Sequence, residues 1–129
     1  MSAWSHLPNA AHIDRVIASA HQHTLIWHES YDADWDEVRT QAQNAVRDRN
    51  ADWNKSRMSA WYAAWDEVFM VVAAHDAILA LVFYDDCAHY LDMPSDKLQV
   101  WALVSKRPAA VLLLPSVIAF ERIRELETV

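Results

Sequence analysis

The chain has 129 residues, 53% of them hydrophobic, which is enough for one domain, residues 1–129, with a sizeable core. It contains no Gly. This excludes the standard forms of phosphate-binding loops, dinucleotide-binding fingerprints and nucleophile elbows, because their backbones turn too tightly for other residues. The net charge of −7 disfavours direct binding to nucleic acid and to anionic membranes.

The single cysteine, Cys87, cannot form an internal disulfide and suits a reducing compartment. The first residues, MSAWSHLPN, lack the basic and apolar regions of a signal peptide. The longest apolar stretch is interrupted by His75 and Asp76, and it falls short of the roughly 18–20 apolar residues that a membrane span needs. We therefore expect a cytoplasmic protein that is not inserted in a membrane.

The first two helices are predicted from their start signals and their apolar spacing. Asn9 is typical of an N-cap, and we expect a helix over about residues 9–28. A second helix follows, with Asp34 and Glu37 matching a capping box. This helix either breaks near residues 50–52, which we favour, or continues into the next one.

Residues 59–92 are predicted to form a long central helix against which the other helices pack. The stretch contains neither Pro nor Gly, so no residue type in it stops a helix. Trp61 and Trp65 lie one turn apart near its start, and the mostly apolar residues 68–83 follow. The end of the stretch, residues 84–92, is polar.

Proline residues separate the remaining helices. Ser95, which follows a Pro, is predicted to cap a helix over about residues 96–105. Pro108 begins the next helix, and Pro115 either kinks that helix or begins another. The predicted fold is therefore all-α, a compact bundle of five or six helices around residues 59–92.

Residues 59–120 contain short motifs rich in Trp, Ala and acidic residues. They are Ala60-Trp61, Ala64-Trp65-Asp66, Tyr84-Asp85-Asp86-Cys87-Ala88, Tyr90-Leu91-Asp92-Met93-Pro94 and Pro108-Ala109-Ala110-Val111-Leu112-Leu113-Leu114-Pro115. With these motifs, about half of the chain resembles a group of Trp- and Ala-rich helical proteins of uncharacterised function, found mostly in phage and mobile-element genomes. The resemblance implies a helical fold and, in a phage setting, the host cytoplasm as the location. It implies no activity, cofactor or catalytic residue.

The polar end of the predicted central helix holds the best candidates for chemistry. Asp85 and His89 are four residues apart, so on a helix both could face one bound Zn²⁺ or Fe²⁺ ion. A complete site would need further ligands such as His75, Asp76 or Asp92, and on one helix about 21 Å separates His75 from His89. We therefore favour a hydrogen-bonded network at a helix end, with no cofactor and no catalytic residue.

Cys87 is poorly suited to nucleophilic catalysis. Its acidic neighbours Asp85 and Asp86 disfavour the thiolate. His89, two residues away, would point to another side of a helix. We expect a buried and unreactive thiol.

The acidic residues between 66 and 96 offer a surface for a protein partner. This segment has seven acidic residues and no Lys or Arg. It could form an acidic face that competes with nucleic acid for a basic groove, or it could simply keep the chain soluble. Two tryptophans nearer the N-terminus could join an interface, where Trp is enriched. The candidate contact residues are Asp66, Glu67, Asp85, Asp86, His89, Asp92, Trp4 and Trp27.

Three functions are compatible with these features. The preferred hypothesis is a non-enzymatic protein-binding module, a phage accessory protein that inhibits or modulates a host or defence complex. The second is a virion or assembly component that forms a homo-oligomer through its apolar helices. The third is a metal-dependent helical enzyme that uses Asp85 and His89.

Overall fold

In the computed structural model, residues 2–31, 35–50, 55–105 and 107–128 are described, and they contain seven α-helices and no strand. The all-α prediction is therefore confirmed, and helices far apart in the sequence pack together in a compact bundle. The helices are α1 (Ala10–Gln22), α2 (Thr24–Glu29), α3 (Asp36–Asn50), α4 (Lys55–Glu67), α5 (Val72–Phe83), the 3-10 helix η2 (Ala88–Asp92), α6 (Ser95–Ser105) and α7 (Pro108–Glu127).

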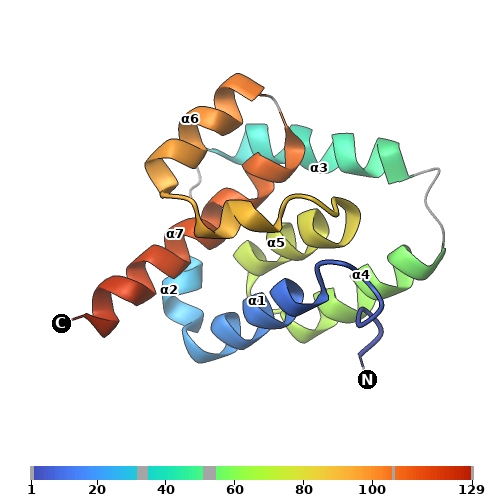
Figure 1. The fold of residues 1–129 in the computed structure, drawn as a ribbon, viewed down its shortest axis with the longest axis horizontal. Coiled ribbons are helices and arrows are strands. Elements are labelled where there is room, and N and C mark those ends of the chain that lie inside the picture. The colour runs from blue at the N-terminus through green and yellow to red at the C-terminus, as the bar shows by residue number, and fades with distance from the viewer. Residues whose placement is uncertain (1, 32–34, 51–54, 106, 129) are drawn as a thin grey trace.

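The helices α5 and α7 lie at the centre because they are apolar on nearly every side, and such helices have to be surrounded by others. In α5, ten of the twelve residues are buried. The helix α7 packs against α5, α6, α3, η2 and α2, while α5 also packs against α1 and α4. Figure 1 shows α7 crossing the molecule, with α6 and α3 above it and α1, α2 and α4 below. None of the helices in the described ranges combines the length and hydropathy that a membrane span requires.

The predicted continuous helix over residues 59–92 is wrong, because the chain forms α4, α5 and η2 in this region. The first break follows Glu67, although neither Pro nor Gly is present. Nε2 of His75 lies 3.0 Å from the carbonyl oxygen of Val68 and 3.1 Å from that of Phe69. The imidazole thus supplies a donor to carbonyls that a longer helix would have paired with its own N–H groups.

The second break follows Phe83, and Asn9 stabilises it from the start of α1. The side-chain amide of Asn9 donates to the carbonyl oxygens of Leu81 at 2.9 Å and of Tyr84 at 2.7 Å. Asn9 holds the N-cap position of α1, as predicted, but makes no side-chain hydrogen bond to that helix. Its amide instead binds the C-terminal carbonyls of α5, so one side chain joins the two helices.

The helix expected over residues 9–28 divides at His23 into α1 and α2. This division, with the break after α4, explains why the described residues contain more α-helices than the predicted five or six. The helix α3 is helical up to Asn50, and the predicted break beyond it falls partly on residues 51–54, outside the described residues. Asp34, the first residue of the predicted capping box, also lies outside them.

The C-terminal helices follow the prediction more closely. The helix expected over residues 96–105 is confirmed as α6, but Ser95, the predicted cap, is its first residue. Ser95 donates from both its N–H and its hydroxyl to the carboxylate of Glu121 at 2.6 Å. Pro115 lies inside α7, so it does not begin another helix. Because Pro has no N–H, the carbonyl of Val111, four residues earlier, loses its usual helical donor.

Replacing Asn9 by Ala should lower the free energy of unfolding by about 1–3 kcal/mol, because it removes donors from buried carbonyl groups. Asn9 is only 4% exposed, which limits replacement by water. Denaturant unfolding followed by circular dichroism measures the change. The exposed Asn44 provides the control, and Asn44→Ala should change the stability by less than about 1 kcal/mol. Equal losses for the two variants would contradict the role of Asn9.

Candidate functional site

Each acidic side chain of residues 84–92 is paired with an arginine from another part of the chain. The arginines come from α4, from the residue before α7 and from α1. The pairs are Asp85 with Arg57 at 2.8 Å, Asp86 with Arg107 at 3.1 Å and Asp92 with Arg15 at 2.9 Å. Exposed pairs of this kind contribute up to about 1 kcal/mol each. They offset much of the negative charge expected at this end of the acidic segment.

The helical geometry assumed for a metal at Asp85 and His89 is not formed. Residues 84–87 leave the helix, and η2 begins only at Ala88. The ring of His89 instead packs against that of Tyr90, with centroids 4.4 Å apart. Within the described part of the chain, no group of three His, Cys, Asp or Glu side chains is arranged to hold a metal ion.

Cys87 lies beneath this polar cluster and is fully buried. Its thiol donates to the carbonyl oxygens of Tyr84 at 3.3 Å and of Ala80 at 3.5 Å. Burial, assisted by the negative charge of Asp86, raises the pKa of this thiol to about 12. The thiolate is therefore scarce near neutral pH, and the residue is not prepared for nucleophilic attack.

The two tryptophans expected at a partner interface are buried in this structure. Trp27 has no exposed surface, and Trp4 retains 8%. The indole N–H of Trp27 donates to Ser19 at 3.0 Å, and its ring packs edge-on against Phe120. Trp4 donates to Asp14 at 2.8 Å. In this conformation both indoles belong to the packing of the N-terminal helices against the bundle, and they contribute little or nothing to the exposed surface.

A buried ion pair between α3 and α5 was not predicted from the sequence. Arg39 and Asp76 each expose only 2% of their surface. Nε of Arg39 lies 3.7 Å from Oδ2 of Asp76, and Gln43 donates to Oδ1 of that carboxylate at 2.7 Å. The guanidinium also binds Asp36 and stacks 3.7 Å above the ring centre of Tyr31. These contacts connect α3, α5 and the end of α2.

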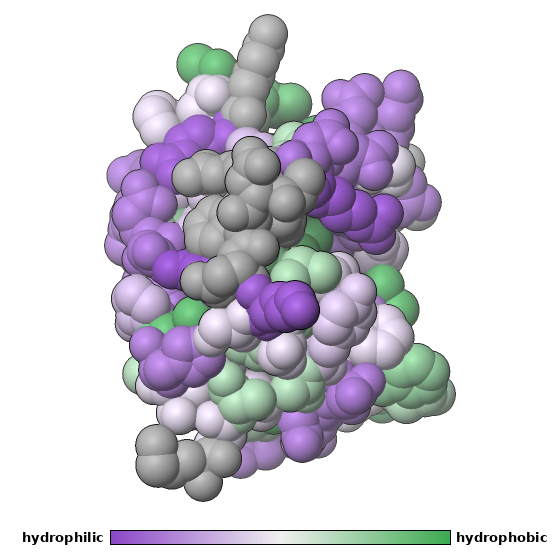
Figure 2. Space-filling view, turned by 90° about the vertical axis from the view of Figure 1, so that its right-hand side faces the viewer, coloured by the Kyte–Doolittle hydropathy of each residue, from purple (hydrophilic) through white to green (hydrophobic). Residues whose placement is uncertain are grey.

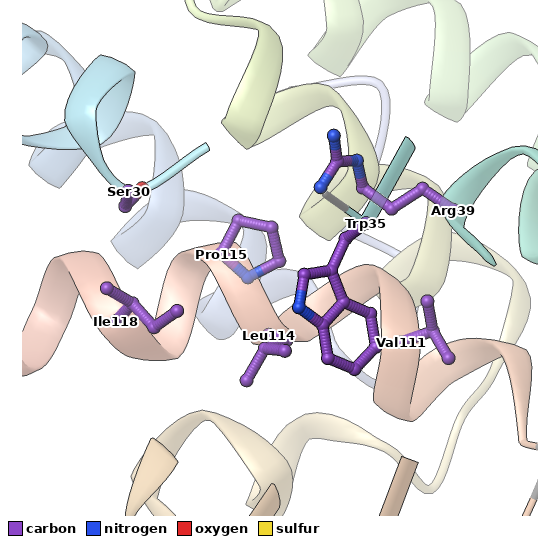
Figure 3. Close-up of a pocket in the computed structure, with 7 residues that line it drawn as sticks. All are labelled: Ser30, Trp35, Arg39, Val111, Leu114, Pro115 and Ile118. Atoms are coloured by element: carbon purple, nitrogen blue, oxygen red, sulfur yellow. The ribbon is translucent and has the colours of Figure 1, made fainter. Parts of the chain in front are cut away.

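The small cavity beside this ion pair has no room for a substrate. Its volume is about 10 Å³, which is the space of about one water molecule. Figure 3 shows the Trp35 indole lying over α7 between Leu114 and Val111, with the Arg39 guanidinium above it. The full lining is Ser30, Trp35, Arg39, Val111, Leu114, Pro115 and Ile118. Side-chain packing thus closes this region, and the ion pair serves the structure.

Two groups of exposed apolar side chains stand out on the surface. The turn surface lies between α4 and α5, and the α6 surface lies on the outer side of α6. The face seen in Figure 2 is mixed, with mostly hydrophilic side chains in its upper part and hydrophobic ones between hydrophilic ones in its lower part. Contiguous apolar patches on a protein surface are candidates for interaction sites. The turn surface consists of Phe69, Met70 and Val72, and the α6 surface of Val100, Trp101, Leu103 and Val104.

A groove of about 340 Å³ lies beside the α6 surface, where α3, α6 and the start of α7 meet. Its walls are mostly apolar, and none of the described residues that line it is charged. Leu103 belongs both to the groove and to the α6 surface, so the two are continuous. The lining residues are Val38, Gln41, Ala42, Ala45, Ala102, Leu103, Pro108 and Val111.

No family model, curated protein or solved structure matches the chain. The resemblance to helical phage proteins thus stays an expectation drawn from the sequence motifs. The two exposed apolar surfaces and the charges beside them are the features of the structure that bear on function.

The buried carboxyl group should make stability depend on pH. Burial raises the pKa of Asp76, whereas the Gln43 hydrogen bond and the charge of Arg39 lower it. Burial has the larger effect, so the pKa rises from 3.8 to about 6. Between pH 3.8 and about 6, the Asp76 carboxyl group is therefore protonated in the folded protein but has lost its proton in the unfolded chain. The stability from this group is fully present below about pH 4 and is lost as the pH rises through about 6. The change corresponds to about 3 kcal/mol.

The variant Asp76→Asn isolates this effect because its side chain does not titrate. The free energy of unfolding of the wild type minus that of the variant should fall by about 3 kcal/mol between about pH 4 and pH 7. Urea unfolding at a series of pH values gives this difference. Asp48→Asn, at an exposed position, is the control and should give a nearly constant difference. A constant difference for Asp76→Asn would show that Asp76 is not perturbed.

Cys87 should resist modification in the folded protein. At about pH 8 we expect its reaction with an aromatic disulfide reagent to be at least about a hundredfold slower than in denaturant, because the thiol is buried and its pKa is raised. Absorbance of the released thiolate follows the reaction. Rapid modification without denaturant, with the fold intact, would contradict the buried position.

Proposed function

We propose that the protein is a non-enzymatic module that binds a protein partner through the turn surface. The supporting observation is the exposure of Phe69 and Met70, which present 58% and 73% of their surface at the turn between two helices. Covering large apolar side chains is favourable because it removes them from water. Aromatic residues and Met are also enriched at protein interfaces.

The turn surface is held in one geometry before a partner binds. The rings of Trp65 and Phe69 pack edge-on with centroids 5.3 Å apart. The ring of His75 packs against that of Trp65, with centroids 4.6 Å apart. Burial lowers the pKa of His75, while its backbone hydrogen bonds oppose this less strongly. A neutral imidazole can still donate from Nε2 to the turn carbonyls. A preformed surface loses less conformational entropy on binding than a mobile one.

Charge beside the turn surface indicates the kind of partner. Asp66 and Glu67 are exposed at the end of α4, directly before the turn, and the last turn of α4 contains no basic residue. An apolar centre with an acidic rim fits a pocket bordered by Lys or Arg. Asp66 and Glu67 were predicted contact residues, and we retain them. The acids of residues 84–92 are paired with arginines within the chain, so we do not include them.

The sequence resemblance suggests the biological setting. In a phage or mobile element, a basic apolar pocket would belong to a host or defence complex in the host cytoplasm. A module that fills such a pocket would inhibit or modulate that complex, for example by competing with nucleic acid for a basic groove. No group of catalytic side chains is required for this function.

Met70→Glu should weaken partner binding at least tenfold, because a carboxylate replaces an apolar contact and faces an apolar pocket. Host lysate passed over immobilised wild-type protein and over the variant provides the measurement, with mass identification of the bound proteins. The captured protein is then titrated against both by calorimetry.

Leu126→Glu is the matched control for that experiment, because Leu126 is 62% exposed on α7, away from the turn surface. It should bind the partner like the wild type. Asp66→Lys should weaken binding mainly at low salt, where the acidic rim acts most strongly. A partner that binds Met70→Glu and the wild type equally would overturn the assignment of the turn surface.

A further inference from the structure

The helix α6 is apolar on both sides, although only one side packs against another helix among the described residues. Leu98 and Ala102 face the bundle and are buried, and α6 packs against α7. On the outer side, Val100, Leu103 and Val104 expose 62%, 60% and 72% of their surface. A helix at the edge of a bundle normally turns polar residues to water. The outer row of α6 therefore forms an apolar ridge.

The groove beside this ridge has the shape to receive another helix. Its walls include the small side chains of Ala42 and Ala45 from α3 and of Ala102 from α6. Small side chains allow a ridge of larger ones to pack between two helices. The volume of about 340 Å³ corresponds to several side chains. A ridge and a groove thus lie next to each other on one face.

We infer that this face binds a second copy of the chain in a dimer with twofold symmetry. About a twofold axis, the ridge of each copy enters the groove of the other, so both ridges and both grooves are covered at once. Leu103 lies where the ridge meets the groove, which places it near the centre of the contact. This face is distinct from the turn surface, which is proposed to bind the partner.

The charge of this face favours a second copy over a different partner. Each copy carries a net charge of −7, so two copies repel each other unless the contact region is neutral. Among the described residues, none that lines the groove is charged. At the start of α6 an acid and a base are adjacent, Asp96 and Lys97, and at its end Asp86 pairs with Arg107. The acids at the two ends of α6 thus each have a basic neighbour, whereas the last turn of α4, beside the turn surface, contains none.

The size of the face is consistent with a reversible dimer. The four side chains of the α6 surface expose between 43% and 72% of their area, which amounts to roughly 400 Å² and falls in the range of functional patches on monomers. A standard interface buries roughly 800 Å² on each partner. The groove walls and the neighbouring surface of α3 would supply the remainder.

The turn surface stays accessible in such a dimer. Figure 1 places α6 at the top of the molecule and α4 at the bottom, with α5 and α7 between them. Variants on one surface should therefore leave binding at the other intact. Failure of one proposal can be distinguished from failure of the other on this basis.

Sedimentation equilibrium of the purified full chain over a range of concentrations tests the dimer. The wild type should approach twice the mass of one chain, 2 × 14.8 kDa = 29.6 kDa. L103E should raise the dissociation constant at least about thirtyfold, the effect of losing a central contact. L126E, which alters an equally exposed Leu on α7, and M70E should dimerise like the wild type. A wild type that stays monomeric at millimolar concentration, or equal weakening by L103E and L126E, would overturn the inference.

A mixing experiment tests the arrangement of ridge and groove. Ala45 is exposed on the groove wall, so A45K should weaken the dimer without disturbing the core. An equimolar mixture of L103E and A45K should dimerise more strongly than either variant alone, because the introduced charges attract each other across the axis. Circular dichroism confirms that both variants are folded. A mixture no stronger than its components would contradict the insertion of each ridge into the opposite groove.

Discussion

The arrangement of this bundle depends on enclosing two helices that are apolar on almost every side. Residues 109–117 of α7 are all buried, and α5 is buried almost throughout. Water can contact neither helix along these stretches without a large cost in free energy, so the other helices have to cover them. Covering them uses one apolar face of each outer helix. Two groups of the apolar residues that stay exposed, on the outer side of α6 and at the turn after α4, have no partner helix among the described residues, and they form the two candidate binding surfaces.

The Arg39–Asp76 pair favours one position of α3 along α5 in this otherwise apolar packing. Apolar contacts alone would allow α3 to pack at several positions along α5. A carboxylate in the core instead requires hydrogen-bond donors beside it, and this requirement favours one of these positions. Arg39 and Gln43 lie one turn apart on α3 and both reach Asp76. The raised pKa of Asp76 indicates that these contacts only partly offset the cost of burial. A buried group that lowers stability while fixing the position of α3 is a known compromise in protein cores.

The parts of the fold that could be predicted are those set by local residue types. The absence of Gly indicated helices, and Ser95 and Pro108 placed the starts of α6 and α7 to within one residue. The breaks around α5 could not be predicted, because distant side chains stabilise them: Asn9 binds the carbonyl of Leu81 from 72 residues away. Only one member of the buried ion pair could be recognised in the sequence. Asp76 stands in an apolar run and so required a partner, but nothing local distinguished Arg39 from the exposed Arg47 on the same helix. The α6 surface could not be predicted from the sequence, because a helix with apolar residues on both sides is expected to be buried in the core.

The two proposed surfaces would act together. A dimer formed through α6 carries two copies of the turn surface, one on each chain. A partner complex with repeated basic pockets could then bind both, and its second contact would form at the high effective concentration that the first contact creates. Avidity of this kind can exceed the affinity of a single site by about two to four orders of magnitude without any new contact. It would compensate for the small area of the turn surface, whose apolar part is limited to Phe69, Met70 and Val72. A module with a small contact area but a fixed geometry therefore gains most from pairing, and the neutral α6 surface provides a way to pair two acidic chains.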